Sequence, residues 1–193
     1  MVQLLITGGA GFIGSHACLA FLAAGNSLVV IDDFSNSSKA PLDRVAELAK
    51  LKNNDRLKII KGDICNRNDL DKAFEASSKG IDAVIHFAGL KSVEDSFKHP
   101  LKYWNVNLNG SCCLLERMKA NNCRTIVFSS SATVYGYPKT IPITEDSAIN
   151  PINPYGYTKA AVENILFNLS KSEDEWRIAS LRYFNPVGAH PSG

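Results

Sequence analysis

The sequence lacks the long apolar runs and the strong charge bias that mark several classes of protein. No apolar stretch approaches the roughly 18 residues of a membrane-spanning helix, so we expect no membrane segment. The N-terminus has no basic stretch followed by a long apolar core, and it therefore predicts no secretory signal. The net charge is only +2 and the basic residues are scattered, which provides no electrostatic footprint for a nucleic acid.

Cysteines are few and lack the spacing of a metal site. Five are present, and no two of them form a C-x-x-C pair. An odd number without that spacing disfavours both a disulfide framework and a bound metal. We expect buried, reduced thiols in a cytoplasmic protein.

The first fourteen residues organise the rest of the chain. Residues 4–6 are a short apolar run typical of a buried strand, and residues 12–24 follow a helical pattern. Gly9–Gly14 lies between them and reads G-x-G-x-x-G, in the context that this motif requires. The glycines allow a tight turn, close approach of the backbone to a pyrophosphate, and close packing of the helix on the sheet. The N-terminus of the helix then offers free N–H groups to that pyrophosphate.

A second strand, over residues 27–31, ends in Asp32-Asp33. These acids follow the glycines by about 20 residues, where a carboxylate binds the 2′-hydroxyl of an adenosine ribose. A carboxylate at that place would repel a 2′-phosphate. The sequence therefore predicts binding of NAD rather than NADP.

Strands and helices alternate along the remainder of the chain. Further strands are predicted over 57–60, 81–86, 125–128 and 177–182, and helices over 39–52, 66–74, 100–120 and 154–171. This alternation predicts an α/β fold, a Rossmann-type doubly wound parallel sheet with helices on both faces. The 193 residues are enough for one such domain, and ligands of this fold bind at the carboxyl ends of the strands.

The helix predicted over 154–171 carries a candidate acid–base pair. Asn153 suits the N-cap and Pro154 the first helical position. Tyr155 and Lys159 are then at i and i+4, on one face. An ammonium near a phenol favours the phenolate and lowers its pKa from about 10, so Tyr155 could exchange a proton with a substrate hydroxyl.

Tyr135 and Lys139 have the same Y-x-x-x-K spacing, but we reject them as the catalytic pair. Gly136 and Pro138 argue against a helix, so the two side chains need not meet. Ser131 strengthens the case for Tyr155 instead. It follows a predicted strand at the ligand-binding edge, where its hydroxyl could hold a sugar oxygen against the tyrosine.

Four motifs together resemble a known family. They occupy residues 7–16, 86–93, 128–136 and 181–193. The chain is similar over its whole length to the UDP-glucose 4-epimerases of the extended short-chain dehydrogenase/reductase superfamily. This resemblance implies that Tyr155 takes the proton of the sugar 4-hydroxyl while hydride passes from C4 to NAD. The resulting 4-keto sugar would rotate and take the hydride back on its other face, which interconverts UDP-glucose and UDP-galactose.

The resemblance also implies roles for individual residues. Ser131, Tyr155 and Lys159 would be catalytic, with Ser131 and Tyr155 touching the sugar and Asn185 touching the substrate's diphosphate. His86, at a strand end, we interpret as a packed core histidine rather than a base. The cofactor-binding residues would be Gly8, Gly11, Phe12, Ile13, Gly14, Asp32, Asn36, Asp63, Ile64, Phe87, Ala88, Gly89, Lys91, Asn107, Lys159, Tyr183 and Phe184.

Members of this family continue beyond the motif that ends at Gly193. By the resemblance they add a sheet strand and most of a substrate-binding domain. We therefore expect residues 1–193 to form an incomplete NAD-binding domain that lacks most of the UDP-sugar pocket and can at best bind NAD. The complete enzymes commonly form homodimers, for which the predicted helices 100–120 and 154–171 are the candidate contacts.

Two alternatives stay open from the residues. The first is another NAD-dependent nucleotide-sugar epimerase or a 4,6-dehydratase. Such dehydratases commonly carry an acidic pair after the loop serine, whereas Ala132 and Thr133 follow Ser131 here. The second is a non-catalytic NAD-binding remnant. Two departures from the family pattern, at Glu94 and Val106, leave the detail of their loops open.

Overall fold

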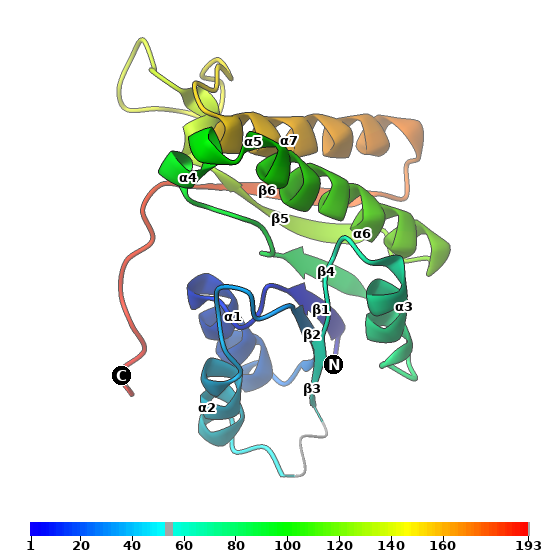
Figure 1. The fold of residues 1–193 in the computed structure, drawn as a ribbon. Helices are drawn as coiled ribbons and strands as arrows, with labels where there is room; N and C mark the ends of the chain where they lie inside the picture. Colours follow the sequence, from blue (N-terminus) through cyan, green and yellow to red (C-terminus); the bar gives the residue numbers. More distant parts are fainter. Residues whose placement is uncertain (53–55, 193) are drawn as a thin grey trace.

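A parallel sheet with helices on both faces forms the centre of the computed structural model, which describes residues 1–52 and 56–192 (Figure 1). Gly193, the last residue of the closing motif, lies outside the described residues. Within the described part, no helix combines the length and the apolar character needed to cross a bilayer.

The apolar runs form the strands, and each neighbouring pair is parallel. The strand order is β3-β2-β1-β4-β5-β6, which confirms the doubly wound fold predicted from the alternating pattern. The order reverses between β1 and β4, and such a reversal opens a crevice at the carboxyl edge. The strands are β1 (Gln3–Thr7), β2 (Ser27–Asp32), β3 (Leu57–Lys61), β4 (Ala83–His86), β5 (Thr125–Ser131) and β6 (Arg177–Tyr183).

The helices cover the two faces of this sheet. Figure 1 shows α1 and α2 on one side, and α3 and α6 on the other. The bounds are α1 (Phe12–Ala23), α2 (Ala40–Leu48), α3 (Arg67–Glu75), α4 (Val93–Lys98), α5 (Pro100–Tyr103), the π-helix η1 (Trp104–Asn109), α6 (Gly110–Ala120), the 3₁₀ turn η2 (Ala132–Tyr135) and α7 (Pro154–Ser172).

Two apolar cores lie on opposite faces of the sheet, because successive side chains of a strand point to opposite sides. Leu5 of β1 belongs to the core shared with α3, α6 and α7. Its neighbours Leu4 and Ile6 belong to the core shared with α1 and α2. All three are buried, and the same alternation recurs in β2. Burial on both faces explains why these strands read as continuous apolar runs.

Two features of the helices differ from the prediction. The helix expected over 100–120 is three successive pieces, α5, η1 and α6, and its middle turn is a π-helix. The short helix α4 was not predicted, although Ser92 and Asp95 carried its signal. The Ser92 hydroxyl accepts from the Asp95 backbone N–H at 3.1 Å, as the spacing S-x-x-D allows at an N-cap.

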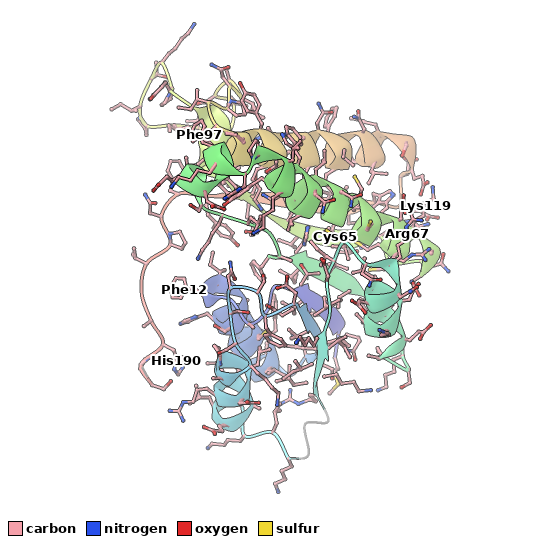
Figure 2. The ribbon with its side chains drawn as sticks, in the orientation of Figure 1. Phe12, Cys65, Arg67, Phe97, Lys119 and His190 are labelled. Atoms are coloured by element: carbon pink, nitrogen blue, oxygen red, sulfur yellow. The ribbon has the colours of Figure 1, made fainter. Side chains whose placement is uncertain are left out.

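After β6 the chain returns toward the first helix. Residues 184–192 run from the end of the sheet past α1 (Figure 1). The backbone N–H of His190, labelled in Figure 2, donates to His16 Nε2 at 3.2 Å. The closing motif is thereby brought to the side of the molecule that carries the glycine-rich turn and Phe12.

Candidate active site

A cavity of about 610 Å³ lies at the carboxyl ends of the strands. Its size is that of a typical small-molecule site. Most of the residues singled out from the sequence line it: Gly8, Gly11, Phe12, Ile13, Gly14, Asp32, Asn36, Asp63, Ile64, Phe87, Ala88, Gly89, Lys91, Ser131, Tyr155, Lys159, Tyr183, Phe184 and Asn185. Asn107 is the exception and lies beneath the cavity wall.

The glycine-rich turn is too crowded for side chains at two positions. Gly8 has a φ of +68°, and a Cβ there would lie 2.6 Å from the backbone nitrogen of Ala88. A Cβ on Gly14 would lie 2.3 Å from the carbonyl oxygen of Gly8 and 2.8 Å from the Cα of Gly9. Since these neighbours are backbone atoms, they cannot move aside cheaply. Only glycine therefore lets α1 begin this close to the end of β1.

The first turn of α1 is open to an anion. Its N-cap is Gly11, which has no side chain to cap the helix, and the first turn has no acidic residue. The first N–H groups of this twelve-residue helix therefore lack a side-chain cap, and Gly11, Phe12 and Ile13 at its start line the cavity. This arrangement suits a pyrophosphate.

Asp32 closes the turn from the neighbouring strand. Its Oδ2 accepts from the Ala10 N–H at 2.9 Å, and its Oδ1 accepts from the Phe34 N–H at 3.0 Å and from the Ser37 hydroxyl at 2.9 Å. Asp32 as a whole is 8% exposed. A carboxylate has about four acceptor sites, so one remains for a ligand hydroxyl.

The predicted acid–base residues meet at the far end of the same cavity. Ser131 ends β5, while Tyr155 and Lys159 lie on α7, and all three are buried. As predicted, Asn153 caps α7 by accepting from the Gly156 N–H at 2.7 Å. The Lys159 ammonium lies 5.9 Å from the centroid of the Tyr155 ring.

The pKa of Tyr155 differs from the prediction. Burial raises it above its usual value, and only the Ser131 hydroxyl acts to lower it. Lys159 does not lower this pKa; its ammonium donates to the backbone carbonyl of Ser129, at 2.8 Å, and lies over the face of the ring. Burial lowers the pKa of Lys159 itself to about 8.

Removing the Lys159 amine should abolish a rise in the free energy of unfolding that we expect at alkaline pH. The pKa of Lys159 is about 8 when folded, against 10.5 when unfolded, so between these values the unfolded chain binds the extra proton. Stability therefore rises with pH across this window, by roughly 3 kcal/mol at most, and is lost again as pH falls through about 8. We expect Lys159→Met to lack this rise in urea unfolding, whereas Lys171→Met, an exposed control on α7, keeps it. If the stability of Lys159→Met rose with pH as much as that of the parent chain, the buried Lys159 ammonium would not be the cause of the rise.

A buried polar chain links the glycine-rich turn to α7. Thr7 Oγ1 lies 2.6 Å from His86 Nδ1, and His86 Nε2 lies 2.9 Å from the Ser111 hydroxyl. Ser111 donates to the carbonyl oxygen of Asn107 at 2.5 Å. His86 is 1% exposed, and burial lowers its pKa to about 3, so it is the neutral core histidine that was predicted.

The Asn107 side chain continues this chain to α7. Its amide donates to the Leu90 carbonyl and to the Thr158 hydroxyl, each at 3.0 Å, and its Oδ1 accepts from the Leu90 N–H at 2.8 Å. Thr158 in turn donates to the Tyr155 carbonyl. Asn107 therefore supports the cavity loop and α7, and its predicted direct contact with a cofactor gains no support from this placement. Asn107 lies in the π-helix η1.

Other residues of the site were not anticipated. The Thr133 hydroxyl donates to Ser131 Oγ at 3.0 Å and orients it. Tyr135, rejected as a catalytic tyrosine, lies in η2, and its hydroxyl accepts from Arg182 at 2.8 Å. Arg182 also pairs with Glu163 of α7. Thr133, Tyr135 and Arg182 lie in the motifs at 128–136 and 181–193, but the Glu163–Arg182 pair joins residues that no local pattern connects.

Comparison with known proteins agrees with this arrangement. Residues 4–193 match the family described as "NAD dependent epimerase/dehydratase family". The chain is 53% identical over 191 residues to "UDP-glucose 4-epimerase 2" of Arabidopsis thaliana, covering 99% of this chain and 54% of that protein. It is 50% identical to "UDP-glucose 4-epimerase" of Bacillus subtilis, covering 100% of this chain and 55% of that protein.

Solved structures give the same result. The UDP-glucose 4-epimerase of Bifidobacterium longum, in complex with NAD⁺ and UDP, superposes with a TM-score of 0.93 at 42% identity. The match covers 99% of this chain and 56% of that one. The chain thus spans about half the length of the curated relatives it matches.

Proposed function

The chain belongs to the NAD dependent epimerase/dehydratase family, and we propose that it carries the NAD-binding and acid–base residues of a UDP-glucose 4-epimerase. One observation carries this proposal: a single cavity joins the glycine-rich turn and Asp32 to Ser131, Tyr155 and Lys159. The 4-epimerase relatives of similar sequence support the choice of reaction.

The residues of the cavity suit NAD. The crowded glycines bring the backbone close to the place of a pyrophosphate, and the uncapped start of α1 offers N–H groups to it. The free acceptor site on the Asp32 carboxylate suits a ribose 2′-hydroxyl. Bound NAD⁺ would supply the hydride acceptor and a positively charged ring near the tyrosine.

The side chains at the other end of the cavity would move one proton. Tyr155 Oη would take the proton of the sugar 4-hydroxyl and return it, while Ser131 would hold the 4-oxygen by a hydrogen bond. Lys159 lies beside them, with its ammonium over the face of the Tyr155 ring. The Thr133 hydroxyl would keep Ser131 in place, since it already donates to the serine oxygen.

The partner molecules follow from the same proposal. UDP-glucose and UDP-galactose would be the substrates, and Asn185, on the exposed segment after β6, would meet their diphosphate. A second copy of the chain would pack on the outer faces of η1 and α7, where Trp104, Tyr157 and Phe167 are exposed; the mass of the particle in solution tests this. The five unbridged cysteines favour the cytoplasm.

Titration with NAD and NADP tests the cofactor assignment. We expect NAD to bind, and NADP to bind at least about tenfold more weakly, because its 2′-phosphate would lie against the Asp32 carboxylate. Asp32→Asn, which keeps an oxygen to accept from Ala10, should narrow this difference. Calorimetric titration of the parent chain and of Asp32→Asn, each with NAD and with NADP, measures both differences. Equal affinity for both cofactors, or binding of neither, would contradict the assignment.

A further inference from the structure

One face of α7 runs along the serines at the end of β5. Tyr155, Lys159 and Glu163 are spaced four residues apart and therefore share this face. Lys159 Nζ donates to the Ser129 carbonyl at 2.8 Å, and one turn further the Ser130 hydroxyl donates to Glu163 Oε1 at 2.5 Å. These two bonds determine the position of α7 along β5.

Arg182 holds the Glu163 carboxylate from the other side. In the sheet Arg182 lies directly opposite Ser130. Its Nε donates to Glu163 Oε1 at 3.0 Å and its Nη2 donates to Oε2 at 2.7 Å, which is the bidentate geometry of a strong pair. The side chains are only 20% and 9% exposed, so solvent screens the pair little.

The same guanidinium reaches the segment between β5 and α7. Its Nη1 donates to the Tyr135 hydroxyl at 2.8 Å and to the Glu145 carbonyl at 3.3 Å. The group also lies over the Tyr135 ring, 5.0 Å from its centroid. The pair of Arg182 and Glu163 therefore joins β5, β6, η2 and α7 at one place.

We propose that the Glu163–Arg182 ion pair is a positioning device that fixes the register of α7 against β5 and so keeps Tyr155 beside Ser131. This inference rests on the proposed function, because it concerns how the acid–base residues are held together. Neither Glu163 nor Arg182 lines the 610 Å³ cavity, so neither touches the substrate or the cofactor there. They act on the acid–base residues only by setting the position of α7.

Loss of the pair should separate Tyr155 from Ser131. Without Glu163, the Ser130 hydroxyl and the Arg182 guanidinium lose their shared partner, and α7 can shift along β5. A misplacement of about 1 Å is enough to cost roughly 100-fold in rate at a reacting centre. The contact with Ser131, the one group that lowers the pKa of Tyr155, would weaken.

The direction in which the pKa of Tyr155 changes distinguishes a shift of the helix from the direct effect of the Glu163 charge. Glu163 lies two turns from Tyr155, about 12 Å along the axis, so removing its negative charge would by itself lower the pKa of the phenol. Loss of the Ser131 contact would raise it. The other groups that face Tyr155 are Lys159 on its own helix and Tyr103, whose ring centroid lies 6.5 Å away.

The experiment uses the full chain with a fluorinated tyrosine at position 155, whose ionisation is followed by ¹⁹F NMR. We expect Glu163→Ala to raise its pKa by roughly half to one unit. The matched control is Glu173→Ala, which breaks the pairs with Lys119 and Arg124 at the other end of α7 and should leave the pKa unchanged. A lowered or unchanged pKa in Glu163→Ala would overturn the proposal.

A milder variant covers the case in which Glu163→Ala does not fold. Arg182→Lys keeps the charge but loses the two-pronged contact and the bond to Tyr135, and it should raise the pKa in the same direction by less. No rise in this variant would also overturn the proposal. Titration of the unaltered chain with NAD tests the proposed function separately, so a chain that binds no NAD but shows the shift would reject that function and keep the positioning role.

Discussion

Gly14→Ala is expected to abolish measurable NAD binding, with a loss of affinity of at least about 100-fold. The added Cβ would lie 2.3 Å from the Gly8 carbonyl oxygen and 2.8 Å from the Gly9 Cα. To relieve these contacts, α1 must move away from the turn, which takes its N–H groups from the pyrophosphate. Such overpacking typically costs about 1–3 kcal/mol, and here it falls on the atoms that form the site.

The matched control for this change is Gly25→Ala. A Cβ on Gly25 meets nothing within 4 Å, although its φ of +86° is strained for alanine. We expect this variant to lose stability in urea unfolding but to bind NAD as the parent chain does. Calorimetric titration of both variants measures the difference. Full NAD affinity in Gly14→Ala would show that the turn does not form the pyrophosphate site.

Tyr155→Phe is expected to remove proton transfer and leave NAD binding almost intact. The phenylalanine fills the same space, but no group at that position can take the proton of the sugar 4-hydroxyl. General acid–base catalysis typically contributes a factor of about 10²–10⁴, so whatever conversion of UDP-galactose to UDP-glucose the parent protein supports should fall by that factor. A coupled assay with NAD supplied measures it.

Tyr157→Phe provides the control from the same helix. Tyr157 is 49% exposed and does not line the cavity of the acid–base residues, so its hydroxyl has no part in the proposed chemistry. Its removal should leave the rate unchanged. Conversion that survives Tyr155→Phe as well as Tyr157→Phe would reject Tyr155 as the acid–base group.

The sequence predicted the parts of the site that depend on neighbouring residues. The strand, the glycines and the start of α1 follow one another within residues 3–14, so their spacing alone indicates the turn. Asn153 and Pro154 likewise predicted the start of α7, and hence the shared face of Tyr155 and Lys159. Alternation of strands and helices predicted a parallel sheet with helices on both faces, because parallel strands need crossover helices.

The parts that depend on contacts through space were not predicted. The raised pKa of Tyr155 follows from burial, which helical spacing does not determine. The bonds of the Asn107 side chain reach Leu90 and Thr158, which are distant in the sequence. A periodic pattern gives the face of a helix but cannot give the groups that this face will meet.

The buried chain through His86 has a fixed direction of hydrogen donation. A carbonyl only accepts, so the Ser111 hydroxyl must give its hydrogen to Asn107 and take one from His86 Nε2. His86 Nδ1 must then accept from Thr7, whose oxygen accepts the Ala88 N–H at 3.2 Å. Both ends of this series of hydrogen bonds are backbone amide groups, which neither release nor bind protons. This series of hydrogen bonds therefore conducts no proton between the glycine-rich turn and α7, and His86 can act only as a fixed, neutral link within it.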